Sequence, residues 1–236
     1  MKSLKMLKTH NPGLLITFCG LDGSGKTTMI KLLAEYLQTM NLPVVLTKQP
    51  TDFVRSSKMF RTFMDTPNHE EYDYRSLSLL CASDRVQHCN REILPLLNSG
   101  HVVISDRYFY SCLANLRARG YKQDKWIYEV SSMIPKPDLA FFMDLEVDTA
   151  IAHVRSRESE KDSFIDMPLQ HRLRAEYLAI ADKNVGITIT VQPDPAKTFA
   201  AVKSAVDKHL LGSSIHISPP VATRTIYNGE AAHVKV

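Results

Sequence analysis

The chain has 236 residues, 44% of them hydrophobic, and a formal net charge of +4. That length is sufficient for a packed core, and no apolar run approaches the roughly 20 residues of a membrane-spanning helix. No concentrated basic patch indicates a nucleic-acid partner, and the four cysteines, which lack a C-x-x-C pair, are typical of reduced thiols. We therefore expect a cytoplasmic protein with no membrane and no nucleic-acid partner.

Short apolar runs alternate with amphipathic stretches along the chain. The apolar runs, bounded by Gly, Pro, Asn or Asp, predict five strands: Leu14–Cys19, Pro43–Thr47, His101–Ser105, Asp138–Met143 and Gly186–Val191. The stretches between and after them predict helices: Thr27–Met40, Glu70–Leu97, Tyr110–Arg119, Lys125–Met133, Val147–Arg157, Leu169–Asp182 and Pro195–His209. This alternation predicts an α/β fold, a three-layer sandwich with a mostly parallel five-stranded sheet flanked by helices.

Two segments depart from the alternation. Residues Arg155–Asp166 are dense in charge and serine, and we interpret them as a mobile lid. Residues Gly212–Val236 show little periodicity and are expected to be an irregular tail. Because no linker or internal repeat divides the rest, residues 1–211 are expected to form one domain.

The segment Gly20–Thr27 matches the pattern G-x-x-x-x-G-K-[ST] between a predicted strand and a predicted helix. The glycines allow backbone N–H groups to approach phosphate oxygens, and the helix N-terminus adds partial positive charge. Lys26 can reach the β- and γ-phosphates, and the Thr27 hydroxyl can ligate Mg²⁺. The alternative is a glycine turn with only a structural role. The expected ATP-binding residues are Gly20, Gly23, Ser24, Gly25, Lys26, Thr27 and Thr28.

Asp106 and Arg107 follow the third predicted strand at its carboxyl end, where open α/β sheets bind ligands. The carboxylate can hold a Mg²⁺-bound water, and the guanidinium can bind a phosphate at two points. The alternative is that Asp106 caps the next helix and Arg107 is a surface charge. With the glycine loop present, we favour the functional interpretation.

Three further arginines have both a functional and a structural interpretation. Arg85 on the long helix is either a donor on the inner face of a cleft or part of an intrahelical pair with Asp84. Arg155 and Arg157 close a helix, where the helix dipole favours cations in any case. Alternatively, one of them reaches over the polyphosphate when the lid closes, as phosphoryl transfer requires.

Together these motifs resemble the thymidylate kinase family, P-loop enzymes that transfer the γ-phosphate of ATP to dTMP. The resemblance spans roughly Leu14 to Val191 and includes the loop F-C-G-L-D-G-S-G-K-T-T, A-S-D-R-V-Q-H around Arg85, and D-R-Y at Asp106. It implies ATP and Mg²⁺ as cofactors, a nucleoside monophosphate as acceptor, a homodimer, and a P-loop three-layer sandwich.

The resemblance also implies a role for individual residues. Asp22 would contact the sugar 3′-hydroxyl or a metal-bound water, Arg107 the acceptor phosphate, and Arg85 the pyrimidine carbonyl edge. Asp106 and Thr27 would hold Mg²⁺. The loop has Ser24 and no basic residue between its glycines, which resembles the bacterial branch of the family. In that branch the catalytic arginine comes from the lid, so the resemblance implies Arg155 or Arg157 for this role. The expected catalytic residues are Lys26, Asp22, Arg107, Arg155 and Arg157, and the expected acceptor-binding residues are Asp22, Lys48, Gln49, Cys81, Arg85, Arg107, Tyr108 and Cys112.

The chain departs from the family pattern mainly around the base. The family places an aromatic ring that stacks on thymine where this chain has Cys81. Phe53, Phe60 or Phe63 could supply a ring in place of the one that the family has at this position. The family often has Glu at the position of Cys19 and Arg-Glu-Pro at Lys48-Gln49-Pro50. It often has Asn or Tyr where this chain has Cys112 and Asn115. Common bacterial members have a lid about one residue longer.

Three functional hypotheses follow. The first is transfer of phosphate from ATP to dTMP, giving dTDP and ADP. The second is the same transfer to a different or modified pyrimidine nucleotide, or to another phosphorylated small molecule. The third is a nucleotide-binding switch protein without phosphotransfer, which has no need for an acceptor-phosphate clamp at Arg107.

Overall fold

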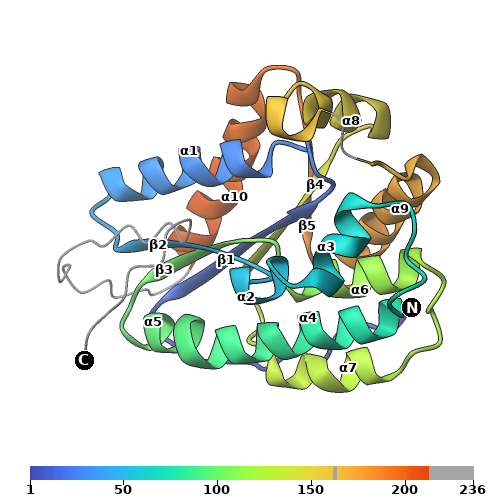
Figure 1. Cartoon of the computed structure of the whole chain (residues 1–236). Coiled ribbons are helices and arrows are strands. Elements are labelled where there is room, and N and C mark those ends of the chain that lie inside the picture. The colour runs from blue at the N-terminus through green and yellow to red at the C-terminus, as the bar shows by residue number, and fades with distance from the viewer. Residues whose placement is uncertain (162–163, 213–236) are drawn as a thin grey trace.

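Five parallel strands form one sheet in the order β2-β3-β1-β4-β5 (Figure 1). The computed structural model describes residues 1–161 and 164–212. The strands are β1 (Leu14–Gly20), β2 (Val44–Lys48), β3 (Val102–Asp106), β4 (Leu139–Asp144) and β5 (Ile187–Thr190). Each begins and ends within one residue of its predicted position, so the predicted five-stranded sheet is confirmed, and every pairing in it is parallel.

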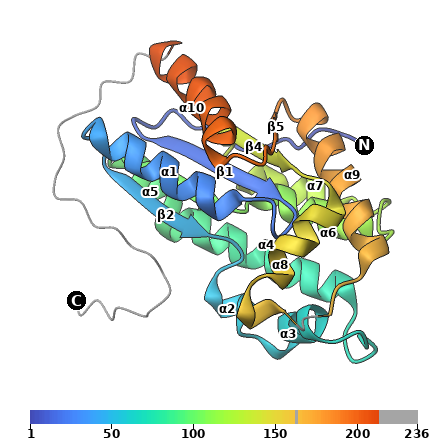
Figure 2. The same ribbon diagram turned by 90° about the horizontal axis from the view of Figure 1, so that it is seen from above.

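Helices cover both faces of the sheet, which confirms the three-layer prediction (Figure 2). Side chains of β1 alternate between the two layers: Leu14, Ile16 and Phe18 pack beneath α1 and α10, whereas Leu15 and Cys19 face α4, α6 and α9. The longer helices are α1 (Lys26–Thr39), α4 (Tyr74–His88), α6 (Phe109–Ala118), α8 (Val147–Arg155), α9 (Met167–Lys183) and α10 (Pro195–Gly212).

The segment between β2 and α4 holds two short helices that were not predicted, α2 (Asp52–Arg55) and α3 (Lys58–Asp65). The Ser57 side chain caps α3 by accepting a hydrogen bond from the backbone N–H of Phe60 at 3.2 Å. Helix α2 has four residues and α3 has eight, so both are too short to show a clear helical period in the sequence. They lie beside α4 and form one wall of the cleft described below.

The helix predicted from Glu70 to Leu97 begins later and is interrupted. It starts at Tyr74, after Asp73 caps it by accepting from the Ser76 N–H. A π-helical turn (Cys89–Ile93) then joins α4 to α5 (Leu94–Asn98). The π-turn lies just before Pro95, which has no N–H to donate to the carbonyl four residues earlier.

The remaining elements are α7 (Trp126–Val130) and two 3₁₀ turns, Ser131–Met133 and Glu158–Glu160. Helix α8 ends at Arg155, two residues before its predicted end, so Arg157 lies beyond it. Within the expected lid, residues 162–163 lie outside the described residues, as do residues 213–236 of the expected tail. In the described part of the chain, no helix has the length and apolar character needed to cross a membrane.

Candidate active site

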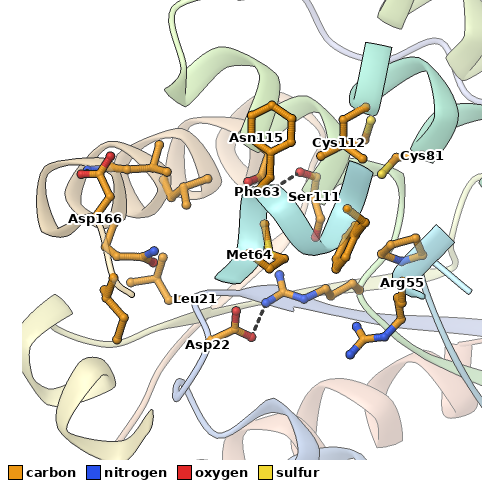
Figure 3. A pocket seen from close by; sticks show the side chains of 18 of the residues that line it. Leu21, Asp22, Arg55, Phe63, Met64, Cys81, Ser111, Cys112, Asn115 and Asp166 are labelled. Carbon is orange, nitrogen blue, oxygen red and sulfur yellow. Dashed lines mark hydrogen bonds and ion pairs between the residues drawn. The ribbon is translucent and has the colours of Figure 1, made fainter. Parts of the chain in front are cut away.

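A cleft of about 1060 Å³ opens at the carboxyl ends of β1, β2 and β3, between the glycine loop and helices α3, α4, α6 and α9 (Figure 3). Parallel α/β sheets place ligand sites at this edge. The cleft brings together most of the residues singled out in the sequence: Gly20, Asp22, Gly23, Gly25, Lys26, Thr27, Thr28, Lys48, Cys81, Arg85, Asp106, Arg107, Cys112 and Arg157.

The glycine loop joins β1 to α1 in the geometry of an anion cradle. Gly23 and Gly25 both have φ of 79°, a conformation that favours glycine. A Cβ on Gly23 would lie 2.0 Å from the Ala150 carbonyl oxygen on α8, so only glycine fits there. A Cβ on Gly25 would meet nothing within 4 Å, so the N-terminus of α1 stays open to an anion.

Lys26 is the first residue of α1, and its side chain folds back into the loop. Its Nζ donates to the Leu21 carbonyl at 2.6 Å and to the Gly20 carbonyl at 3.3 Å, and the residue is only 6% exposed. Burial, together with the nearby Arg107 cation, lowers the pKa of Lys26 to about 8, although Asp22 and Asp106 oppose this shift. Phosphate oxygens would offer this ammonium stronger, charge-assisted partners than two carbonyls.

We expect kcat/KM for the nucleotide donor to fall as the pH rises through about 8, because Lys26 must be protonated to bind phosphate and its pKa in the free protein is about 8. The measurement is a profile of kcat and kcat/KM between about pH 6 and pH 10. Bound phosphates favour the ammonium, so the corresponding fall in kcat should come at higher pH. Lys26→Arg should remove the alkaline limb, since a guanidinium stays charged. An unchanged limb in that variant would contradict the assignment.

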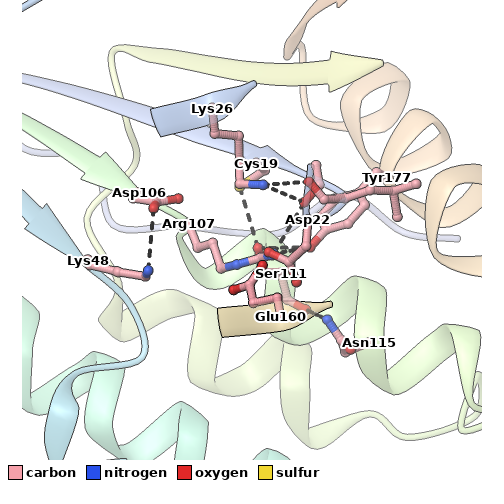
Figure 4. A network of polar contacts seen from close by, with 12 residues as sticks. Cys19, Asp22, Lys26, Lys48, Asp106, Arg107, Ser111, Asn115, Glu160 and Tyr177 are labelled. Atoms are coloured by element: carbon pink, nitrogen blue, oxygen red, sulfur yellow. Dashed lines mark hydrogen bonds and ion pairs between the residues drawn. The ribbon is translucent and has the colours of Figure 1, made fainter. Parts of the chain in front are cut away.

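Arg107 is held at the end of β3 by three groups (Figure 4). Its guanidinium donates to Asp22 Oδ1 at 2.5 Å, to the Tyr177 hydroxyl at 3.1 Å and to the Gly20 carbonyl at 3.2 Å. The backbone of Arg107 has φ of 65°, an uncommon conformation for a residue with a side chain. Burial opposes the charge on Arg107, but Asp22 and the other partners outweigh it and raise its pKa further.

Asp22 lies near two cations of the cleft, Arg107 and Lys26. Desolvation by the surrounding protein opposes ionisation of its carboxyl. The positive charges of Arg107 and Lys26 outweigh that effect and hold the pKa of the carboxyl well below the usual range. Its side chain is still 72% exposed, so it faces the open cleft. Asp22 is therefore an ionised carboxylate that could accept a hydrogen bond from a sugar hydroxyl bound next to Arg107.

Tyr177 and Ser111 belong to this network but were not among the predicted site residues. The Tyr177 hydroxyl accepts from Arg107 and donates to Ser111 Oγ at 3.1 Å, and Ser111 lies 3.7 Å from the Cys19 thiol. Burial raises the pKa of the Cys19 thiol, which keeps it neutral. Tyr177 comes from α9, far from Arg107 in the sequence, and the signal that could have identified it is its place in residues 172–177 (R-L-R-A-E-Y), a segment that also resembles the thymidylate kinase family.

Asp106 and Lys48 face each other as register partners on β3 and β2. Lys48 Nζ lies 3.7 Å from Asp106 Oδ2, while Asp106 Oδ1 is buried without a hydrogen-bond partner in the described residues. Thr27 is exposed in the cleft. In residues 1–161 and 164–212, no three His, Cys, Asp or Glu side chains gather as a metal-ligand set. An unpartnered carboxylate oxygen and a hydroxyl in the same cleft fit Mg²⁺, which usually keeps waters and binds mainly through substrate phosphates.

Arg85 lies on the inner face of α4 and is only 2% exposed. Its Nη1 donates to the Cys81 carbonyl at 2.9 Å, and its Nε has no hydrogen-bond partner among the described residues. The Asp84 carboxylate instead accepts from the backbone N–H and hydroxyl of Thr51, so the geometry does not favour an ion pair with Asp84 as the role of Arg85. A buried, incompletely satisfied guanidinium in a cleft can bind a carbonyl oxygen of a ligand.

Four of the expected site residues do not line the cleft. Gln49 is fully buried and contacts His88 Nδ1 at 3.0 Å, and Tyr108 is fully buried and donates to the Pro135 carbonyl at 2.8 Å. Ser24 is buried within the loop, and Arg155 is exposed at the last residue of α8. Arg157 does line the cleft, where it pairs with Glu160 at 2.9 Å.

The glycine loop precedes helix α1, and Arg107 lies at the end of the neighbouring strand β3 of a parallel sheet. This combination is typical of a P-loop kinase fold. A family model described as thymidylate kinase matches residues 18–199. The "Probable thymidylate kinase" of Pyrococcus horikoshii is 40% identical over 174 residues, covering 72% of this chain and 83% of the relative. The thymidylate kinase of Desulfotalea psychrophila is 33% identical over 153 residues, covering 65% and 74%.

Among solved structures, a crystal structure of thymidylate kinase from Ehrlichia chaffeensis aligns with a TM-score of 0.60 and 28% identity, covering 82% of this chain and 98% of that chain. The chain belongs to the thymidylate kinase family. The resemblance seen in the sequence is thereby confirmed.

Proposed function

We propose that this protein transfers the γ-phosphate of ATP to dTMP, giving dTDP and ADP, in a Mg²⁺-dependent reaction. The observation that carries the proposal is the juxtaposition of two anion-binding groups in one cleft, Lys26 in the glycine loop and Arg107 at the end of β3, with Asp22 near both. Membership of the thymidylate kinase family supports dTMP as the acceptor.

On the donor side, the backbone of the glycine loop and Lys26 would hold the ATP phosphates. Thr27 and Asp106 would hold Mg²⁺, which would neutralise part of the negative charge on the phosphates. The Asp106–Lys48 pair keeps one carboxylate oxygen engaged and leaves the other available. Positioning and charge stabilisation are the main requirements of phosphoryl transfer, and these side chains can supply both.

On the acceptor side, Arg107 would bind the nucleotide phosphate at two points. Its bonds to Tyr177 and Gly20 hold the guanidinium in place, while the more exposed Asp22 would contact the sugar. Arg85 would read a carbonyl edge of the base. The phosphate oxygen of the acceptor is then aimed at the donor phosphate for in-line attack.

We expect Arg157→Ala to reduce kcat by about 10²- to 10³-fold, because its guanidinium lines the cleft and can exchange Glu160 for a phosphate as charge develops. Arg155→Ala should change kcat by less than about threefold, since Arg155 is exposed outside the cleft lining. Steady-state kinetics of both variants, with ATP and acceptor saturating, make the comparison. The reverse ranking would assign the lid cation to Arg155.

The test of the proposed function is an ADP-release assay of the full chain with a panel of nucleoside monophosphates, with and without Mg²⁺. Turnover with dTMP that exceeds turnover with the other nucleotides supports the proposal. Activity with other acceptors and none with dTMP would favour the second candidate, a different or modified pyrimidine nucleotide. That candidate is favoured by Cys81, a small side chain that lines the part of the cleft near Arg85. A nucleotide-binding switch protein without phosphotransfer would have no use for Arg107 as a ligand of an acceptor phosphate.

We also propose that the protein is a cytoplasmic homodimer in which residues 1–211 form one domain. Support for the dimer comes from the family resemblance and from Leu79, an apolar residue of α4 that is 50% exposed. Light scattering of the purified chain tests it. A single continuous sheet supports the one-domain organisation.

A further inference from the structure

Two aromatic rings on α3 line the cleft opposite α4. Phe60 and Phe63 are three residues apart, so they lie on the same side of this helix, and both line the cavity. Figure 3 shows Phe63 and Met64 of α3 around the same cavity as Cys81 of α4 and Cys112 of α6. Phe53, on the preceding helix α2, is 77% exposed and does not line the cavity. Of the three phenylalanines that could replace the missing ring, only the two on α3 therefore line the cleft.

The two rings have different surroundings. Phe63 is 7% exposed, and its ring packs against His69 at a centroid distance of 4.7 Å and edge-on against Tyr74 at 5.1 Å. Phe60 is only partly buried and has no aromatic partner among the described residues. Phe63 is thus held in place by its neighbours, whereas Phe60 has ring surface left for a ligand.

The facing side of α4 carries short side chains and unsatisfied polar groups. Ser78 and Cys81 lie one turn apart on it, both lining the cavity, and burial raises the pKa of the Cys81 thiol, which stays neutral. The buried Arg85 Nε has no hydrogen-bond partner in the described chain, and the buried Ser78 hydroxyl has only the Tyr74 hydroxyl as a polar neighbour. A planar ligand with polar edges would satisfy those groups and stack on the opposite wall.

We propose that α3 supplies the stacking surface for the base of the phosphate acceptor, with Phe60 as the stacking ring and Phe63 as its support, while the short Cys81 side chain on α4 leaves the other face of the base without a ring. This inference rests on the proposed function only in taking the acceptor to be a nucleotide. The ligand class is a planar nucleobase with at least one carbonyl, joined to a sugar phosphate that Arg107 binds.

The first experiment measures equilibrium binding to Phe60→Leu by titration calorimetry with two probes, dTMP and 2-deoxyribose 5-phosphate. A stacked ring contributes enough that Phe60→Leu should weaken dTMP binding by about five- to twentyfold. Binding of the sugar phosphate, which has no base, should change by less than about twofold. Phe53→Leu, the matched control outside the cleft, should leave both affinities unchanged. Equal weakening of both probes, or no weakening of dTMP binding, overturns the proposal.

The second experiment asks whether a ring on α4 can replace the ring on α3. Cys81→Phe introduced into Phe60→Leu should restore at least half of the lost dTMP affinity, because it places a ring on the other face of the same base. Continued weak binding by a folded double variant, verified by its circular dichroism spectrum, counts against a base held between α3 and α4. If the double variant does not fold, the two-probe comparison with Phe60→Leu decides alone.

The two proposals fail in different ways. If the wild-type chain binds and phosphorylates a nucleotide other than dTMP, the proposed acceptor is wrong, and the Phe60→Leu comparison is made with that nucleotide and its base-free sugar phosphate. If dTMP is phosphorylated but Phe60→Leu binds it normally, the proposed function stands and the α3 stacking surface is wrong.

Discussion

Lys26→Ala is expected to lower kcat/KM for ATP by about 10³-fold or more. The physical reason is the position of this ammonium, which lies inside the glycine loop with only two backbone carbonyls as hydrogen-bond acceptors. A triphosphate would bring negative charge into contact with it in a poorly hydrated site, where electrostatic interactions are strong. The same burial lowers the pKa of Lys26 to about 8, which shows that the folded protein opposes this charge when no anion is bound.

Because the buried charge is itself unfavourable, Lys26→Ala should not unfold the protein. Thermal unfolding should therefore show a midpoint close to that of the wild type, while the ADP-release assay shows the loss of turnover. Lys31→Ala is the matched control, since Lys31 lies on the same helix but is exposed and does not line the cleft. Turnover of Lys26→Ala within about tenfold of the wild type would mean that phosphate transfer does not take place at this loop.

Arg107→Lys is expected to reduce kcat/KM for the acceptor by about 10²- to 10³-fold, although it keeps the positive charge. A guanidinium can contact Asp22, Tyr177 and the Gly20 carbonyl through different N–H groups, and it can bind a phosphate at two points. A lysine ammonium is a point charge on a flexible stem and cannot reproduce that geometry. The loss should be seen mainly with the acceptor, leaving KM for ATP within about threefold.

Kinetics at varied acceptor concentration measure this effect, with Arg91→Lys, an exposed arginine outside the cleft, as the control. Tyr177→Phe should give an intermediate result, an increase in acceptor KM of about three- to tenfold, because it removes one hydrogen bond that orients Arg107. An Arg107→Lys enzyme with normal acceptor kinetics would show that this guanidinium does not bind the acceptor phosphate.

Much of the cleft was predictable because its signals are local. The glycine loop needs particular residues at fixed spacing, and the apolar runs on either side of it indicate a strand and a helix. The carboxyl ends of parallel strands meet at one edge, which brings Asp106 and Arg107 to the loop without further information. The five strands were predicted because strands buried on both faces are nearly continuous apolar runs.

The direction of individual side chains was not predictable to the same degree. Lys48 faces Asp106 across the sheet, and Gln49, the next residue, has its side chain buried against His88 instead. Successive side chains of an extended segment point to opposite sides, so only one of these two neighbours can face the cleft. Tyr108 follows Arg107 at a backbone with positive φ and is likewise buried behind the site.

The helix end near the lid shows a similar limit. The sequence does not distinguish Arg155 from Arg157 as the cation of the lid. In the structure α8 ends at Arg155, and of these two arginines only Arg157, beyond that end, lines the cleft. Helix boundaries depend on capping and on tertiary contacts, which a charge pattern does not encode. The short helices α2 and α3 were missed because four and eight residues are too few for a clear helical period, and with α3 the placement of Phe60 and Phe63 in the cleft was missed.

By itself the sequence determined the parallel α/β architecture, the phosphate-binding loop and the family, because each rests on residue types at short, fixed spacing. Only the tertiary structure decided which side chains surround the acceptor. Tyr177 reaches Arg107 from α9, and Phe60 and Phe63 of α3 line the same cleft as Cys81 of α4, across gaps in sequence that carry no periodic signal. Packing between elements far apart in the chain determines those contacts, so the base end of the cleft could be described only after folding.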